Sequence, residues 1–182
     1  MSDDARVNYE TREDGSIAVV SMARERYRNA LSPQMMAELQ AAFDEAVADE
    51  DVRVIVLRGE GPSFSAGHDL GSPDVGDRDE REAAPMAVKY NNNRALDPDP
   101  LLRFRALPKP TIAMVHGHCI YAAWMLASSM DVIFASEDAQ FLATNFQYFS
   151  VPWDIGARRA KHLLFGNQFL SGSEAMEIGF VQ

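Results

Sequence analysis

Two segments of the sequence share a layout that could aim backbone N–H groups at a single oxygen atom. Each is an apolar strand followed by small residues and then a turn or a helix start: VIVLRGEGPSFSAGHDL (54–70) and TIAMVHGHCIYAAWMLA (111–127). Small residues at a strand end let a ligand approach the backbone, and the first turn of a helix has N–H groups without intrahelical partners. Two such loops could form an oxyanion hole. Ordinary strand–helix packing produces the same pattern, so the spacing alone leaves both interpretations open.

Hydrophobic periodicity predicts the elements that must position these loops. The predicted strands are residues 17–22, 52–59, 111–115, 131–136 and 139–141. The predicted helices are residues 32–49, 122–129, 156–166 and 171–179. Ser32 is the expected N-cap of the first helix, and Ser171 or Ser173 that of the last. Residues 60–77 are predicted to form a loop and residues 78–106 helical pieces. Because strands and helices alternate, we expect an α/β fold with one domain over residues 1–182.

Composition argues against several classes of protein. The 182 residues carry a formal charge of -10, whereas sequence-independent nucleic-acid binding needs a positive surface. No run approaches the ~18 apolar residues of a membrane span, so no membrane partner is expected. The polar N-terminus and the single cysteine, Cys119, predict a cytoplasmic protein without disulfides or a cysteine-based zinc site. His116 and His118 lack nearby carboxylate partners, so we expect structural roles for them and no metal site.

Four stretches of the chain resemble the crotonase superfamily, also called the enoyl-CoA hydratase/isomerase family. They are RERYRNALSPQM (24–35), VIVLRGEGPSFSAGHDL (54–70), KPTIAMVHGHCIYAAWMLASSMDVIFAS (109–136) and FLSGSEAMEIGFV (169–181). The resemblance implies the crotonase (ClpP/crotonase-like) fold, in which stacked ββα units form two roughly perpendicular sheets surrounded by helices. It implies an acyl-CoA thioester as ligand, with no cofactor besides the coenzyme A of the substrate. It also implies a homotrimer or a dimer of trimers.

The resemblance assigns the two oxyanion donors to the backbone N–H groups of His68 and Ala122. These groups would stabilise an enolate formed from the thioester. Family members often have glycine at the position of Ala122, but alanine also donates an N–H. The imidazole of His68 could take part in proton transfer or simply point to solvent or to coenzyme A.

The two glutamates with which family hydratases add water are replaced in this sequence. By correspondence they fall at Met125 and Asn145, and neither side chain exchanges a proton at neutral pH. Asp154 is the remaining well-placed carboxylate, because some isomerases and dehalogenases of the superfamily use an aspartate at about this place. The alternative is that Asp154 is the N-cap of the next helix. Trp153 could form a wall of the pocket and raise the pKa of Asp154, or belong to the core.

Further residues are candidates for substrate binding. In the family a basic residue near Arg24, Arg26 and Arg28 meets the phosphates of coenzyme A, although these arginines could equally form a solvated surface. Ser65 and Ala66 would contact the adenine through their backbones, and Asp69 would fix the loop by accepting backbone N–H bonds. The acyl pocket could be shaped by Met125, Asn145 and four aromatic residues that could also be packing: Tyr121, Trp124, Tyr148 and Phe149.

The sequence therefore predicts an enoyl-CoA hydratase/isomerase-like enzyme, a lyase or isomerase of fatty acid metabolism, that lacks the usual glutamate pair. Two alternatives stay open: a non-catalytic acyl-CoA-binding or assembly subunit, and a C–C hydrolase or decarboxylase on the same scaffold. The resemblance also implies helices beyond Gln182 that cover the acyl pocket and build the trimer, so we expect a domain without this C-terminal helical segment.

Overall fold

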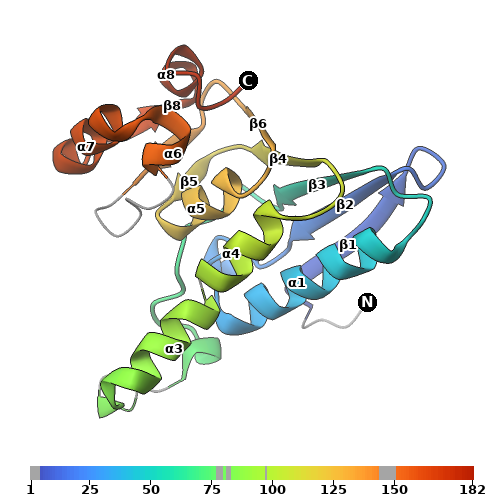
Figure 1. The fold of residues 1–182 in the computed structure, drawn as a ribbon, viewed down its shortest axis with the longest axis horizontal. Helices are drawn as coiled ribbons and strands as arrows, with labels where there is room; N and C mark the ends of the chain where they lie inside the picture. The colour runs from blue at the N-terminus through green and yellow to red at the C-terminus, as the bar shows by residue number, and fades with distance from the viewer. Residues whose placement is uncertain (1–4, 77–79, 81–82, 97, 144–150) are drawn as a thin grey trace.

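The computed structural model describes residues 5–76, 80, 83–96, 98–143 and 151–182, and its centre is a five-stranded sheet (Figure 1). The order across this sheet is β1-β2-β3-β4-β6. β1 and β2 are antiparallel, and every other neighbouring pair is parallel. The strands are β1 (Val7–Arg12), β2 (Ile17–Met22), β3 (Val54–Gly59), β4 (Thr111–Val115) and β6 (Val132–Ala135). The predicted alternation of strands and helices is confirmed.

One face of this sheet is buried beneath helix α1 (Pro33–Ala48). Alternate strand residues point to this face, as the period of two requires; Ala18, Val20, Met22, Ile55, Leu57 and Ala113 have no exposed surface. α1 begins where the sequence predicts, because the Ser32 hydroxyl accepts the N–H of Met35 at 3.1 Å and Pro33 occupies the first turn. β1, β2 and α1 form one ββα unit, and β3 follows it in the chain.

A second, smaller sheet lies beside α5 (Ala122–Ser128) and consists of three short strands. They are β5 (His118–Ile120), β7 (Gln140–Leu142) and β8 (Leu170–Ser171), in the order β5-β7-β8. β7 matches the predicted strand at residues 139–141, whereas β5 and β8 were not predicted. α5 is buried along its whole length, since all seven of its residues lie in the core.

The remaining helices surround these two sheets. Those with described bounds are α3 (Met86–Leu96), α4 (Pro98–Arg105), α6 (Val151–Ile155), α7 (Ala157–Gly166) and α8 (Gly172–Glu177), with short 3-10 turns η1 (Glu25–Tyr27) and η2 (Pro73–Val75). α3 and α4 are the expected helical pieces of residues 78–106, and α7 and α8 are the predicted C-terminal helices. α3 extends away from the sheet, whereas α6, α7 and α8 gather around the small sheet (Figure 1). No helix in the described part of the chain is long and apolar enough to cross a membrane.

Candidate active site

The loop after β3 is attached to the small sheet through Ser65. The N–H of Ser65 donates to the His118 carbonyl at 3.0 Å, and the Ser65 carbonyl accepts from Ile120 at 3.2 Å. The Ser65 hydroxyl is also occupied, since it donates to the Asn29 carbonyl and accepts the N–H of Gly67. This loop therefore runs along β5, which leads directly into α5.

Gly67 brings the two predicted loops into contact. A Cβ atom on this residue would lie 2.4 Å from the carbonyl oxygen of Ile120 and 3.3 Å from the backbone nitrogen of Ala122. The φ angle of Gly67 is +85°, a conformation that side chains disfavour. Only glycine permits this approach, and the consequence is that the chain at residue 67 lies close to the first residue of α5.

The N–H of His68 is oriented by pairing on both sides of the residue. Leu31 donates to the carbonyl of Gly67 at 2.7 Å, and Asp69 donates to the carbonyl of Leu31 at 3.0 Å. In a parallel bridge of this kind, the residue between the two bonded neighbours directs its own N–H away from the bridging strand. The N–H of His68 therefore points away from Leu31.

The N–H of Ala122 opens α5. An N–H in the first turn of a helix has no partner within the helix, and no hydrogen bond of this group is found in the described structure. Tyr121 precedes it with φ 54° and ψ -113°, which turns the chain sharply between β5 and α5. Ala122 is 1% exposed. An oxygen placed here would meet a buried donor at the positive end of a short helix.

Met125 lies in the same helix and belongs to the hydrophobic core, with 5% of its surface exposed. Its thioether cannot donate or accept a proton at neutral pH. Asn145, Tyr148 and Phe149, the other sequence candidates of this region, lie outside the described residues. α5 thus supplies backbone donors and, apart from Ser128, apolar side chains.

Asp154 lies at the other end of α5 from Ala122. Its Oδ1 atom pairs with Arg105 at 3.3 Å, and together with Ser128 these residues line a cavity of about 480 Å³. Ser128 closes α5 six residues after Ala122, a rise of about 9 Å along the helix axis. The structure therefore does not bring Asp154 next to the two donor N–H groups.

The environment of Asp154 favours its neutral form. Burial raises the pKa of the carboxyl, and the nearby Ser128 hydroxyl and Arg105 only partly oppose this effect. The Oδ2 atom of Asp154 and the Oγ atom of Ser128 are both buried without a hydrogen bond of normal geometry, so we regard their mutual contact as weak.

Two expectations for this segment are wrong. Asp154 is not the N-cap of the following helix, because it is part of α6 and Gly156 is the N-cap of α7. Trp153 does not belong to the core, since it is 80% exposed and its ring centre lies 5.9 Å from the Arg105 guanidinium; its part in a pocket wall stays a prediction. A tryptophan beside an aspartate in sequence can point away from it when both lie on a helix.

Arg24 is placed differently from the phosphate-binding residue that the sequence suggests. Its guanidinium contacts Asp69 at 2.6 Å and Asp74 at 3.1 Å, and its side chain is 9% exposed. Asp69 also accepts the N–H groups of Gly71 and Ser72, so the expectation that this aspartate fixes the loop is confirmed. The Arg24 side chain is therefore mostly enclosed, with carboxylates as its ionic partners.

Arg28 and Ala66 remain accessible beside the donor loop. Arg28 is exposed, and its carbonyl accepts the N–H of Ala66 at 2.9 Å. The backbone N–H and carbonyl of Ser65 are both used by β5, which leaves them unable to contact an adenine ring. Of the predicted coenzyme A contacts, the structure keeps the Arg28 side chain and the Ala66 carbonyl available, since the Ala66 N–H is already used.

His116 and His118 support the loop after β3. His116 Nε2 lies 2.8 Å from the carbonyl oxygen of Gly61, and His118 Nδ1 lies 3.5 Å from the Ser63 hydroxyl. Among the residues described, no group of three or more His, Cys, Asp or Glu could hold a metal ion. These contacts agree with the structural roles expected for both histidines.

Asn29 was missed by the sequence analysis. Its side-chain amide donates to the carbonyls of Glu60, Ser63 and Phe64, and its Oδ1 accepts the N–H of Arg24. Its φ angle of 54° is one that asparagine tolerates better than most residues. In the sequence, Asn29 is only a polar residue shortly before the expected N-cap Ser32. Its role in holding the loop depends on carbonyls more than 30 residues away, which only the fold brings close.

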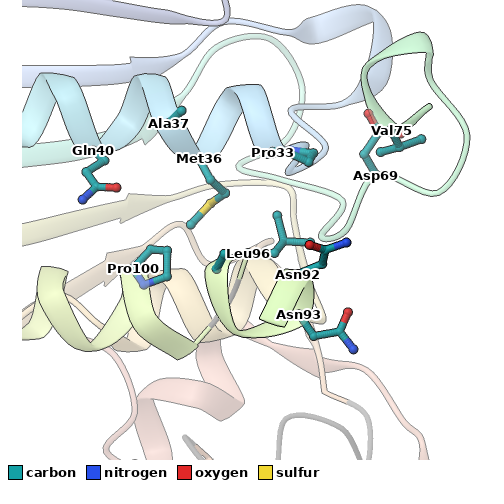
Figure 2. Close-up of a pocket in the computed structure, with 11 residues that line it drawn as sticks. Pro33, Met36, Ala37, Gln40, Asp69, Val75, Asn92, Asn93, Leu96 and Pro100 are labelled. Carbon is teal, nitrogen blue, oxygen red and sulfur yellow. The ribbon is translucent and has the colours of Figure 1, made fainter. Parts of the chain in front are cut away.

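A pocket of about 530 Å³ opens between α1 and the helices α3 and α4 (Figure 2). Asp69 and Val75 lie at one end of the pocket and Gln40 toward the other, while the Met36 side chain points into the space between the helices. Asn92, Asn93 and Leu96 contribute the α3 side. The pocket thus begins one residue from His68 and has a mixed apolar and carboxamide lining.

Comparison with known proteins identifies the family of this chain. The family described as Enoyl-CoA hydratase/isomerase matches residues 12–182. The chain belongs to the enoyl-CoA hydratase/isomerase family. The crotonase fold predicted from the four motifs is confirmed by solved structures: a probable enoyl-CoA hydratase from Mycobacterium smegmatis has a TM-score of 0.85 and 35% identity over 96% of this chain and 70% of that chain. An enoyl-CoA hydratase/isomerase from Xanthobacter autotrophicus also has a TM-score of 0.85. Its identity is 33%, over 97% of this chain and 65% of that chain.

Similar sequences are found in the same family. EchA13 of Mycobacterium tuberculosis, named provisionally as an enoyl-CoA hydratase, is 38% identical over 200 residues, which is 96% of this chain and 62% of that protein. The probable peroxisomal enoyl-CoA hydratase 1 of Arabidopsis thaliana is 30% identical over 93% of this chain and 63% of that protein. The chain therefore spans slightly less than two thirds of the length of these two relatives.

Proposed function

We propose that this chain binds the thioester group of an acyl-CoA and stabilises an enolate, with the backbone N–H groups of His68 and Ala122 as donors. The close approach of Gly67 to the Ile120 carbonyl and to the nitrogen of Ala122 carries this proposal, because it supports a side-by-side position of two segments from distant parts of the chain. The resemblance to enoyl-CoA hydratases supplies the substrate class.

The expected catalytic benefit is electrostatic. Enolate formation moves negative charge onto the thioester oxygen, and preorganised donors stabilise charge that develops during reaction more than charge present in the substrate. Removing one such donor costs about 10²–10³ in rate. Burial of Ala122 strengthens its interaction, because less water competes for the oxygen.

Proton transfer needs a group besides these two donors, and Asp154 is the residue to test. An assay with saturated, 2-enoyl and 3-enoyl thioesters should compare the unmodified protein with Asp154→Asn. Turnover of 2- or 3-enoyl thioesters supports a hydratase/isomerase-like enzyme. Because Asp154 lies at the far end of α5, we expect the variant to keep this turnover. A loss of turnover with unchanged thioester binding would give Asp154 a part in the chemistry.

A non-catalytic acyl-CoA-binding function is the second candidate, and Met125 favours it. By the resemblance, this buried thioether takes the place of a glutamate of family hydratases, so α5 offers no carboxyl group for proton transfer. Calorimetry that shows tight binding of acyl-CoA, together with no turnover on the thioester panel, would support this function. Multiple turnovers of any thioester would reject it.

The pocket between α1 and α3 is our candidate for the acyl chain, since Asp69 at its end adjoins His68. Ala37→Trp would fill the pocket from the exposed side of α1. We expect a higher KM for longer acyl-CoA thioesters and unchanged binding of free coenzyme A. Ala41→Trp, one turn further along α1 and outside the pocket lining, is the matched control. Equal effects of the two substitutions would place the acyl chain elsewhere.

A further inference from the structure

We propose that Arg24 is a positioning residue for the N–H of His68 and that it acts through Asp69. The inference rests on the proposed function, since it concerns how one of the two oxyanion donors is held. It replaces the phosphate-binding role that the sequence suggests for Arg24.

The first step is the buried ion pair itself. The Arg24 Nη1 atom lies 2.6 Å from Asp69 Oδ2, and the two side chains are 9% and 3% exposed. The Nη2 atom of Arg24 donates a hydrogen bond to the Ser72 hydroxyl, which in turn donates one to the Asp69 carboxylate. A charged pair that water hardly reaches holds its geometry more firmly than a surface pair.

The second step links Asp69 to the donor. The Asp69 N–H donates to the carbonyl of Leu31 at 3.0 Å, and the Leu31 N–H donates to the carbonyl of Gly67 at 2.7 Å. His68 therefore lies between two residues, Gly67 and Asp69, whose backbones are hydrogen-bonded to Leu31. Asp69 Oδ1 holds the chain beyond it by accepting the N–H groups of Gly71 and Ser72. A displaced Asp69 would move the peptide group between His68 and Asp69, and through the backbone angles of His68 it would change the direction of the His68 N–H.

The third step concerns the anchoring of Arg24. Its backbone N–H donates to Asn29 Oδ1 at 2.9 Å, and its Nη1 atom donates to the Ala30 carbonyl at 3.2 Å. Arg24 thus holds Asp69 from the same segment that pairs with Gly67 through Leu31. Hydrogen bonds from Ser72, Arg24 and Gly71 outweigh burial and lower the pKa of Asp69, so the carboxylate is charged at neutral pH.

Arg6 provides a matched control within the same network. Its Nε atom contacts Asp74 at 2.6 Å, and Asp74 also contacts Arg24 at 3.1 Å. The contacts described for Arg6 involve Asp74 and Glu38, and none of them is with Asp69. Loss of Arg6 should therefore weaken the network without releasing Asp69.

The experiment uses a conjugated acyl-CoA as a chromophore, such as cinnamoyl-CoA. Its absorption shifts to longer wavelength when the thioester oxygen accepts strong hydrogen bonds, so the shift reports the donors directly. We expect Arg24→Met to bind the probe with a Kd within about threefold of the original protein, because the probe's other contacts remain, but to lose most of the shift. For any thioester turned over, kcat should fall at least about tenfold with little change in KM.

Two further variants keep the test decisive. Arg24→Lys should recover part of the shift, whereas Arg6→Met should lower the melting temperature and keep the full shift. If Arg24→Met does not fold, Asp69→Asn replaces it, since the amide retains Oδ1 for Gly71 and Ser72 but loses the charge that Arg24 holds. A full shift in Arg24→Met or its replacement, or an equal loss in Arg6→Met, would overturn the inference. A probe that binds the original protein without any shift, or does not bind it, would instead overturn the proposed function.

Discussion

Gly67 is the residue on which contact between the two donor segments depends. In Gly67→Ala the new methyl group would lie 2.4 Å from the Ile120 carbonyl oxygen, at a φ angle of +85°. We expect a loss of about 1–3 kcal/mol in the free energy of unfolding from strain and overpacking, together with loss of thioester binding. Urea unfolding and calorimetry measure the two effects.

Gly71→Ala is the control for this substitution. A methyl group at Gly71 meets nothing within 4 Å, although the two glycines are four positions apart in the same loop. Its stability and binding should match those of the original protein. Thioester binding that survives in Gly67→Ala would mean that the two segments need not touch.

At the scale of single residues, prediction from sequence succeeds where residue identity is tied to backbone geometry. Small residues at two strand ends are enough to indicate the neighbourhood of Gly67 and Ala122. The sequence could not place Arg24, because the partner carboxylate of this arginine is 45 positions away and only the fold brings them together. The expectation that Trp153 belongs to the core was wrong for a related reason. Adjacency in sequence says little about the direction in which a side chain on a short helix points.

At the scale of elements, the junction of α4, α5 and α6 has a testable pH dependence. Burial raises the pKa of Asp154 above its ordinary value of 3.8, so the folded state binds more protons than the unfolded state at pH values above 3.8. Stability from this group is therefore present at low pH and lost as pH rises. Asp154→Asn should be more stable than the original protein at pH 7, and the advantage should shrink near pH 4.

Thermal unfolding at both pH values measures this difference. Asp138→Asn, at an exposed position before β7, corrects for removing one negative charge from an acidic chain. A destabilised Asp154→Asn at pH 7 would show that the ionised carboxylate is well satisfied, against its environment in the structure.

The start of α8 offers a second prediction at this scale. Ser171 and Glu174 form a capping box, in which the serine hydroxyl accepts the N–H of Glu174 at 3.2 Å and the glutamate accepts the N–H of Ser171 at 2.8 Å. Ser171→Ala should lower the free energy of unfolding by about 1 kcal/mol. Ser173→Ala, within the same helix, should have a much smaller effect, and chemical denaturation of both variants will show whether the difference holds.

Strands with a clear apolar pattern were predicted, whereas β1, β5 and β8 were not. β2 and β4 match the predicted ranges, because alternating or continuous apolar residues between turn signals mark them. β5 and β8 have three and two residues and form through pairing with β7, so neither has a periodicity of its own. β1 is also held mainly by its neighbour, since its side chains are half-buried or exposed.

At the scale of the whole molecule, a charged network connects the beginning of the chain to the loop near the site. Arg6 next to Asp74, aided by Ser32 and Arg24 against the opposing effect of burial, lowers the pKa of Asp74 from 3.8 to about 2. The unfolded chain binds this proton more readily, so the stabilisation is complete above pH 3.8 and is lost as pH falls toward 2. Asp74→Asn should flatten the dependence of unfolding free energy on pH in this range.

Urea unfolding between pH 5 and pH 2 tests that dependence. Asp99→Asn is the control, because Asp99 pairs with Arg94 at the surface, where both side chains are about half exposed and the pair contributes little. A slope that stays unchanged in Asp74→Asn would show that other carboxylates set the acid sensitivity.

The unequal exposure of Arg24 and Arg28 gives ionic strength two separable effects. Dissolved ions screen charges at the surface over about 10 Å in 0.1 M salt but have little access to a buried pair. Coenzyme A held by the exposed Arg28 would dissociate more readily in concentrated salt, while the Arg24–Asp69 contact would persist. Buffers that weaken substrate capture should thus leave the geometry of the oxygen-binding amides intact, and a weakly bound acyl-CoA would be easiest to detect in dilute buffer.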